Sequence, residues 1–513
     1  MRASTGKTSI ALLTAASLAA GCARTGHTPD DMLVVVTEGR IRDLDPRFAL
    51  TNYDNKLSRL VTPGLMSIDQ ASMEPRLELA ESLEQLDDTT WEVVVRPDAR
   101  FPNGAPVTAA DVVYTFASTM DETVGSIYRD AWRERISRVE ARDERTVRFH
   151  LQQPVATFPS DLDYGIVSAR AATGWVVGAG PYRVVATWGE RVWLQRNWHY
   201  YGARPPVSFI EVRTIRDANA RFLLLVGGDA DLAQNGVRVD LVSALEQRPS
   251  LRVMQGPSAL LTYLMMNNED ERLSDVRVRR AIAYAVDRER IVSAKFHDRA
   301  ILATGLLPPM HWAYRGDVRR YDYDPERAMQ LLDEAGYPDP PGGEPRMRLV
   351  YKTSADQFRV AIARVIASQL GEVGIEVEVR SFEFGTFFED IKRGEFEIAT
   401  MQTAPIVEPD WYYTYFHSAS IPHEGNWGLH NRWRFRNDRA DALMTEGRRT
   451  ADRDARMRIY AEVQQILAEQ VPVIPLWHED NIVVTGQRVQ GYELLPSARL
   501  RGLEKARKVS RTR

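Results

Sequence analysis

The sequence predicts a mixed α/β protein built from several domains, and three observations support this fold class. Patterns typical of helices and patterns typical of strands alternate along the chain without a repeat period, which argues against a solenoid or a propeller. The length of 513 residues corresponds to roughly three domains at about 150 residues each. Apolar residues make up 44% of the chain, which is enough for sizeable cores.

Strand patterns dominate the first half of the chain. Short apolar or alternating runs predict strands at Met32–Val36, Thr90–Arg96, Tyr182–Ala186 and Arg191–Arg196, the last two as a hairpin. Between them, Thr108 and Asp111 form a capping pair, so a helix is expected to begin directly after Thr108. A strand, a turn and a helix therefore follow one another within thirty residues.

Helical spacing of apolar residues dominates the second half. It predicts helices at Val276–Phe296, at Phe358–Leu370 and at Ala455–Glu469, and another that begins at the Asp324-Pro325 cap and is closed by Gly336. Gly371 and Gly374 are expected to break the second of these helices before an alternating strand, Ile375–Val379. Val473–Trp477, after the last of these helices in the chain, is predicted to be an extended apolar segment.

Composition excludes several classes of partner. The chain has 66 basic and 70 acidic side chains, so it lacks the overall positive charge that attracts nucleic acid. Its single cysteine, Cys22, excludes an intramolecular disulfide and thiolate-bound zinc or iron-sulfur centres. We expect no cofactor and no nucleic acid as partner.

Residues 1–21 have the anatomy of a secretory signal peptide. Arg2 and Lys7 precede a small and apolar run from Ile10 to Ala20 that is too short for a stable membrane span. The run leads into Leu18-Ala19-Ala20-Gly21-Cys22, which resembles a bacterial lipobox and implies that Cys22 is lipidated and becomes the first mature residue. Ordinary cleavage that leaves a free thiol is the alternative.

Catalytic signatures are absent from the sequence. There is no GxSxG elbow, no GxxxxGK[ST] loop and no GxGxxG after a strand. His417, His423 and His430 form a histidine cluster in a loop-like stretch, where a metal site is possible although no helix or strand holds them on one face. Glu408 and Asp410 are paired acids without a nearby nucleophile, which favours a solvated or ligand-facing loop. No residue is predicted to be catalytic or to bind a metal.

Several motifs follow one another in an order that carries a family resemblance. They are Leu44-Asp45-Pro46, Trp91–Phe116 (WEVVVRPDARFPNGAPVTAADVVYTF), Gly178–Tyr182 (GAGPY), Tyr263–Asn267, Val276–Arg290 (VRVRRAIAYAVDRER) and Asp324–Tyr337 (DPERAMQLLDEAGY). Together they span nearly the whole mature chain. The chain resembles the family 5 extracellular solute-binding proteins, the oligopeptide, dipeptide and nickel receptors of ABC importers.

The resemblance implies a two-lobed periplasmic-binding-protein-like fold of type II, in the large cluster that carries an extra subdomain. Two crossing strands are expected to join the lobes. The implied division is a signal peptide (1–21), a lipid-anchored tether (22–31), lobe I in three parts (32–60, 177–266 and 476–513, the last with a basic C-terminal tail), an inserted subdomain (61–176) and lobe II (267–475).

The function implied by the resemblance is that of a receptor, not of an enzyme. It would capture short peptides between its lobes by hinge closure, as a monomer anchored to the membrane on the extracytoplasmic face of a bacterial envelope, and deliver them to the permease and ATPase of an ABC transporter. One alternative keeps the fold but binds nickel or another small non-peptide ligand. A periplasmic lipoprotein hydrolase is a further alternative, which would need a nucleophile or a metal.

The resemblance also suggests which segments face the ligand: the loop after Pro46, Asp163–Ser168, Tyr263–Asn267, Gly305–Tyr314 and Met401–Tyr412. In peptide-binding relatives the last segment carries an aspartate that pairs with the α-amino group of the peptide, and Pro405 takes its place here. Glu408 and Asp410 are the candidates to replace it. The predicted ligand-binding residues are Tyr263, Asn267, Trp312, Glu408, Asp410, Trp411 and Tyr412, although the aromatic ones are equally suited to a lobe core.

Overall fold

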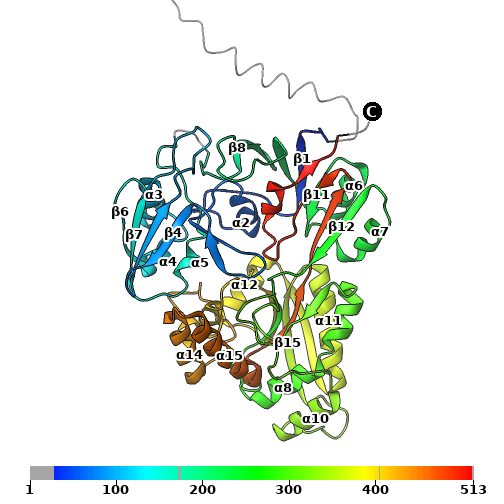
Figure 1. The fold of residues 1–513 in the computed structure, drawn as a ribbon. Coiled ribbons are helices and arrows are strands. Elements are labelled where there is room, and N and C mark those ends of the chain that lie inside the picture. Colours follow the sequence, from blue (N-terminus) through cyan, green and yellow to red (C-terminus); the bar gives the residue numbers. More distant parts are fainter. Residues whose placement is uncertain (1–27, 172–174, 404, 511–513) are drawn as a thin grey trace, which may run out of the picture.

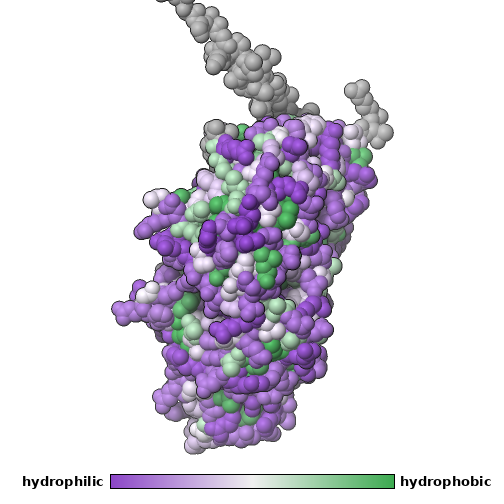
Figure 2. Space-filling model, turned by 60° about the vertical axis from the view of Figure 1, so that its left-hand side comes forward, coloured by the Kyte–Doolittle hydropathy of each residue, from purple (hydrophilic) through white to green (hydrophobic). Residues whose placement is uncertain are grey.

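The computed structural model describes residues 28–171, 175–403 and 405–510, which form two lobes stacked one on the other (Figure 1). The upper lobe in this view, lobe I, contains both ends of the described chain. The face seen in Figure 2 is mainly hydrophilic, with small and scattered hydrophobic spots.

Lobe I is built on a seven-stranded sheet. Its order is β12 (Leu251–Gly256), β19 (Asn481–Gly486), β11 (Leu232–Gln234), β1 (Met32–Thr37), β10 (Phe209–Thr214), β9 (Arg191–Arg196) and β8 (Tyr182–Trp188). β1 pairs in parallel with both β10 and β11, so its apolar side chains from Leu33 to Val36 are fully buried. The predicted hairpin is confirmed, because β8 and β9 are antiparallel neighbours.

A four-stranded sheet extends lobe I to the left in Figure 1. Its order is β4 (Ala80–Gln85), β5 (Thr90–Val95), β7 (Thr146–Leu151) and β6 (Ile136–Ala141). The alternation predicted for β5 is confirmed, since Trp91, Val93 and Val95 lie in the core. The helix start is confirmed as well: the Asp111 carboxylate accepts hydrogen bonds from the backbone N–H (2.9 Å) and the hydroxyl (2.7 Å) of Thr108.

Short elements complete lobe I. They are α2 (Asn52–Ser58), β2 (Met66–Ile68), β3 (Pro75–Leu77), α3 (Ala109–Met120), η1 (Glu122–Val124), α4 (Arg129–Arg135), α5 (Phe158–Asp161), α6 (Ala218–Gly227), η2 (Val239–Leu241), α7 (Val242–Glu246), β20 (Val489–Gln490), η5 (Leu500–Glu504) and β21 (Arg507–Lys508). All strands of the four-stranded sheet fall within residues 61–176, the stretch expected as an inserted subdomain, while the outer boundaries of that stretch stay a prediction.

Lobe II contains a six-stranded sheet. Its order is β14 (Ala300–Leu302), β18 (Val473–Glu479), β13 (Thr262–Met266), β17 (Ile398–Gln402), β15 (Met347–Ser354) and β16 (Ile375–Phe382). The helical segments around it are α8 (Val276–Ala285), α9 (Arg288–Ile291), η3 (Val292–Phe296), α10 (Pro325–Glu334), α11 (Gln357–Glu372), α12 (Phe384–Arg393), α13 (Trp411–Phe416), η4 (Ser418–Ser420), α14 (Asp438–Arg449) and α15 (Arg453–Gln470).

Two helices of lobe II differ from their prediction. The single helix expected at 276–296 is interrupted, because Val286 is extended and the Asp287 carboxylate caps a new helix by accepting from the backbone N–H of Arg290 at 2.9 Å. α11 runs through Gly371 and ends one residue later. The chain turns instead at Gly374, whose φ of +85° favours glycine.

The chain crosses between the two sheets twice, after β12 and after β18. Strand pairing places these crossings differently from the predicted division. β13, which ends at residue 266, hydrogen-bonds to β17 and β18 in the six-stranded sheet, and β18 continues to Glu479. Backbone pairing therefore favours lobe boundaries near residues 260 and 480 over 266 and 475.

The two ends of the described chain are tied to each other in lobe I. The Lys508 ammonium lies 2.9 Å from the Asp231 carboxylate and donates to the carbonyls of Pro29 (2.7 Å) and Met32 (3.0 Å). Its side chain is only 1% exposed. The segment from residue 499 to 508, expected as part of a basic tail, is therefore bound to the fold.

No helix within the described ranges is both long and apolar enough to cross a membrane. The expected signal peptide and Cys22 lie outside the described residues, as do residues 22–27 of the expected tether.

Candidate ligand site between the lobes

The parallel strands of both sheets direct their carboxyl ends towards the opposite lobe. β11 runs antiparallel to β19, which begins at the crossing, and β1 and β10 run parallel to β11. In lobe II, β17 ends beside the start of β13, which follows the first crossing. β15 and β16 run parallel to β17. Ligands of open α/β sheets bind outside the carboxyl ends of the strands. The interface between the lobes is therefore the candidate ligand site.

Side chains and backbone groups of the two lobes meet at this interface. The Ser160 hydroxyl donates to Glu408 Oε2 at 2.9 Å, and the backbone N–H of Ala156 donates to the carbonyl of Arg448 at 2.8 Å. Arg453 Nε lies 2.5 Å from Glu74 Oε1. The structure thus has the two lobes in direct contact.

Apolar side chains from both lobes pack beside these polar contacts. Ile68 and Met73 of lobe I are buried against Ala259, at the first crossing. Met310 and Val407 of lobe II pack against the same group. Opening of the interface would expose these side chains to water.

Three acid–arginine pairs line the interface. Arg135 pairs with Asp161, and Arg456 pairs with Glu408. Arg448 donates to Asp410 from Nε (2.9 Å) and from its terminal nitrogen (2.8 Å). The negative charges of the three carboxylates therefore equal the positive charges of the three guanidinium groups. The Glu408 and Asp410 side chains are at most 10% exposed.

The proximity of these acids changes their proton affinity. Burial raises the pKa of Asp161 to about 6, Arg135 opposes this rise, and Asp410 and Glu408 add to it. Burial also raises the pKa of Glu408, although Arg456 and the Ser160 hydroxyl oppose it. Asp161 was not among the predicted site residues, because its nearness to residues 408 and 410 depends on the folded chain.

The two predicted amine-binding acids already have cationic partners. Glu408 is paired with Arg456, and Asp410 with Arg448. A peptide amine would have to exchange with one of these guanidinium groups, because each carboxylate is largely enclosed. The amine assignment stays a prediction with this added requirement.

Trp312 lies with these interface charges, whereas Trp411 makes ring contacts within lobe II. The guanidinium carbons of Arg453 and Arg456 are 5.3 and 5.4 Å from the Trp312 ring centroid. Trp411 is half-buried next to Tyr415 and His430. Of the predicted ligand-binding residues, Trp312, Glu408 and Asp410 are thus brought together.

Tyr263, Tyr412 and Asn267, the other predicted ligand-binding residues, make their contacts within lobe II. Tyr263 is 2% exposed, and its ring packs edge-on against Trp433 at 5.6 Å. Tyr412 is 1% exposed and stacks on Tyr460. The Asn267 amide donates to the carbonyls of Gly394 and Phe396 at 3.0 and 3.1 Å. Because these three side chains pack or hydrogen-bond inside lobe II, their predicted role in binding a ligand at the interface is not supported.

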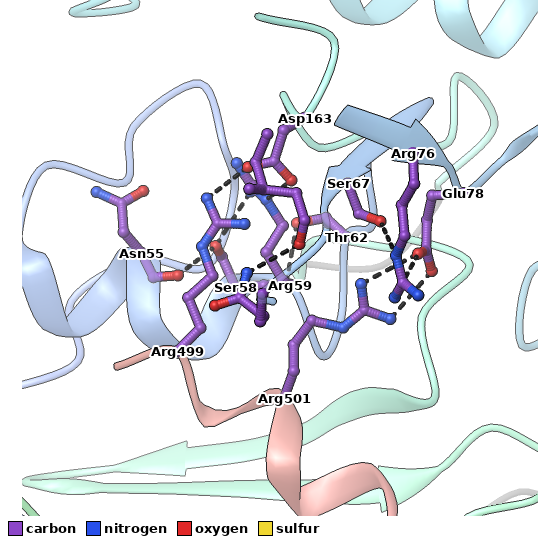
Figure 3. A network of polar contacts seen from close by, with 12 residues as sticks. Asn55, Ser58, Arg59, Thr62, Ser67, Arg76, Glu78, Asp163, Arg499 and Arg501 are labelled. Carbon is purple, nitrogen blue, oxygen red and sulfur yellow. Dashed lines mark hydrogen bonds and ion pairs between the residues drawn. The ribbon is translucent and has the colours of Figure 1, made fainter. Parts of the chain in front are cut away.

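A second polar network lies within lobe I (Figure 3). Asp163, from a segment predicted to face the ligand, is paired with Arg59 and with Arg499. Burial raises the pKa of Asp163, but the two guanidinium groups hold it below its usual value. Arg501 similarly donates to Glu78 at 3.0 and 3.1 Å. These pairs attach the C-terminal segment to Asp163, which also holds Arg59 after α2, and to Glu78 after β3.

The histidine cluster does not form a metal site in the described residues. No group of three or more histidine, cysteine, aspartate or glutamate side chains there is arranged to hold a metal ion. The His417 ring contacts the Thr445 hydroxyl at 3.2 Å, and burial lowers the pKa of His430 to about 4.

Comparison with known proteins agrees with this architecture. Residues 74–422 match the bacterial extracellular solute-binding proteins, family 5 Middle. The chain belongs to this family. Over 491 residues it is 27% identical to the oligopeptide-binding protein AppA of Bacillus subtilis (strain 168), with 89% of this chain and 87% of AppA covered. The family and the relatives that it matches are binding proteins.

Solved structures of periplasmic binding proteins share the two-lobed fold. AppA from Bacillus subtilis in complex with a nonapeptide matches with a TM-score of 0.77 and 24% identity, covering 93% of this chain and 99% of AppA. NikZ from Campylobacter jejuni in complex with Ni(L-His) matches with a TM-score of 0.79 and 23% identity, covering 94% and 100%. Solved structures of this fold thus include a peptide complex and a nickel complex.

Proposed function

We propose that this family 5 protein is a receptor that captures short peptides between its lobes and delivers them to the permease and ATPase of an ABC importer. The observation that carries the proposal is the set of three acid–arginine pairs where the two lobes meet, contributed by both lobes. A zwitterionic peptide has a cationic amino end and an anionic carboxyl end. A carboxylate of the set can bind the amino end and a guanidinium group can bind the carboxyl end.

Capture would proceed by closure of the lobes. A ligand stabilises the closed state only through contacts that the open state lacks. Ser160 and Asp161 belong to lobe I, whereas Glu408 and Asp410 belong to lobe II, so a ligand that contacts both sets gains its full binding energy only when the lobes meet. No bond in the ligand is made or broken.

A lipid anchor would complete this role. β1 directs its carboxyl end towards lobe II, so its amino end, and Thr28 before it, lie on the side of lobe I away from the interface. A lipid on Cys22 would therefore attach the protein to the extracytoplasmic face of the membrane without obstructing the interface.

Thermal unfolding with defined peptides tests the proposal. A ligand at a hundredfold excess over its Kd stabilises the folded state by about 2.7 kcal/mol. A mixed pool of tri- to pentapeptides should therefore raise the melting temperature. N-acetylated versions should raise it less, because acetylation removes the charge that a carboxylate recognises.

Two isosteric variants identify the acid that receives the amine. Asp410→Asn and Glu408→Gln each keep the side-chain shape and remove the charge, and the variant that loses the preference for free peptides marks the acid. Asp317→Asn is the matched control, because Asp317 is an exposed partner of Arg315. Equal shifts with free and acetylated peptides would reject the carboxylate assignment. No shift with any peptide would reject peptides in favour of a non-peptide ligand.

A further inference from the structure

A cavity of about 290 Å³ lies entirely within lobe II. It borders residues 471–475, at the start of β18. The edge strand β14 pairs with residues 477–479 of β18, so it does not cover this first part of the strand. None of the three interface acids lines this cavity. It is thus a separate space from the candidate peptide site.

The wall of the cavity is mainly apolar. Its buried apolar side chains include Leu261, Leu306, Phe416, Leu467 and Val473. Engineered apolar cavities of about 150 Å³ bind benzene, and small-molecule pockets begin at about 300 Å³. The volume therefore fits a molecule larger than benzene but smaller than a typical drug.

One buried hydroxyl in the wall has no acceptor for its proton. The backbone N–H groups of Leu306 and Leu307 interact with the Tyr412 hydroxyl oxygen, but no described residue accepts a hydrogen bond from this hydroxyl, and Tyr412 is only 1% exposed. A buried hydroxyl without an acceptor is unfavourable, so it favours a ligand that supplies one.

The charges that line the cavity favour an anion. Arg288 donates to the backbone carbonyls of Ala303 (3.0 Å), Pro475 (2.8 Å) and Tyr321 (3.2 Å), and none of these hydrogen bonds neutralises its charge. The other charged lining residues are Arg319, Arg320, Glu289 and Asp322, so the lining carries three guanidinium groups and two carboxylates. Asp322 and Glu289 attract the Arg288 charge and Arg320 repels it, and the five side chains together carry one net positive charge.

We propose that this cavity binds a small apolar carboxylic acid with a body of about eight carbons. The apolar body fills the cavity, the Tyr412 hydroxyl donates to the carboxylate, and Arg288 with its neighbouring arginines supplies the positive potential. This site is independent of the peptide site, so either can fail without the other.

Titration of the protein with sodium octanoate, followed by calorimetry, tests the proposal. We expect one octanoate per chain and a higher melting temperature. Ala468→Leu places extra atoms in the cavity wall and should weaken binding at least tenfold. Ala461→Leu, seven residues earlier on α15 and outside the lining, is the matched control and should bind as the wild type does.

Two further measurements cover the case in which Ala468→Leu fails to fold. Titration of wild-type protein carrying ¹³C-labelled leucine methyls should move the resonances of Leu306 and Leu467. Tyr412→Phe keeps the ring and should weaken octanoate binding about tenfold, the effect of a hydrogen bond to a charged group.

Several outcomes would overturn the proposal. One is a wild-type protein that neither binds octanoate nor shows shifts of these methyl groups. Another is unchanged affinity in a folded Ala468→Leu variant, or displacement of octanoate by the peptide pool, since either would place the acid elsewhere. Unchanged affinity in Tyr412→Phe would overturn the assignment of the donor.

Discussion

Ser160 donates a hydrogen bond of 2.9 Å to Glu408, a residue 248 positions further along the chain. The contact links α5 of lobe I to the loop that precedes α13 in lobe II. Glu408 is also the partner of Arg456, so one carboxylate connects the two lobes and neutralises a buried guanidinium group.

Removal of this contact should weaken closure of the lobes. Ser160→Ala deletes one hydrogen bond of about 1 kcal/mol, which corresponds to roughly a fivefold smaller ratio of closed to open molecules. Small-angle scattering without ligand should show a larger radius of gyration. Ser137→Ala is the control, because Ser137 is exposed and bonds within lobe I to the carbonyl of His150. An unchanged radius in Ser160→Ala would contradict the prediction.

The raised pKa of Asp161 should make stability depend on pH. Its folded-state value of about 6 exceeds the unfolded value of about 4, so the folded state binds the proton more tightly between these values. The free energy of unfolding should therefore rise as pH falls from 7 towards 4, by up to about 3 kcal/mol from this group.

Asp161→Asn is expected to remove this contribution and to stabilise the protein at pH 7. Urea unfolding of both proteins from pH 4 to 8 measures the difference, which should shrink as the pH falls. Asp317→Asn, at an exposed position where Arg315 lowers the pKa of the carboxyl, should leave the slope above pH 5 unchanged. A difference between wild type and Asp161→Asn that does not vary with pH would refute the assignment.

The buried contact between Lys508 and Asp231 should contribute strongly to the stability of lobe I. Lys508→Met leaves a buried carboxylate without its cation, which costs on the order of 3 kcal/mol. Lys505→Met removes a pair in which both side chains are at least half exposed, so it should cost less than about 1 kcal/mol. Chemical unfolding of both variants compares them, and equal losses would show that burial is not decisive.

Cys22 is predicted to be the membrane anchor. Cys22→Ser should move the protein from the membrane fraction to the soluble extract, because no other attachment is expected. Its melting temperature should not change, since β1 begins ten residues later, at Met32. Ala23→Ser, next to the cysteine, should stay with the membranes. A Cys22→Ser protein that also stays there would reject the lipobox interpretation.

Local patterns predicted most of the secondary structure because the relevant interactions are short-range. The apolar run of β1 and the contact between Thr108 and Asp111 each depend on residues within one element. The break at Asp287 was missed because helical spacing of apolar residues continues through Val286. The assignment of β13 to lobe II depends on partners more than 130 residues away, which no local pattern contains.

The candidate site was only partly predictable for a similar reason. Glu408, Asp410 and Trp312 were identified by resemblance and do lie together. Their arginine partners, Arg448 and Arg456, come from α14 and α15, and no spacing rule connects them to the acids. Tyr263 and Tyr412 were predicted to bind the ligand but lie in the core of lobe II, because an aromatic side chain in a ligand-facing segment is equally suited to a core.

The position of β19 determines the order in which the protein can be assembled. This strand lies between β11 and β12, yet it consists of residues 481–486, close to the end of the chain. While the ribosome is still translating, the first lobe to emerge therefore has a gap with two unpaired strand edges, and such edges are prone to aggregation. The sheet that contains β1 is completed by a strand that follows all of lobe II in the chain, so lobe I cannot complete its sheet before lobe II has been synthesised.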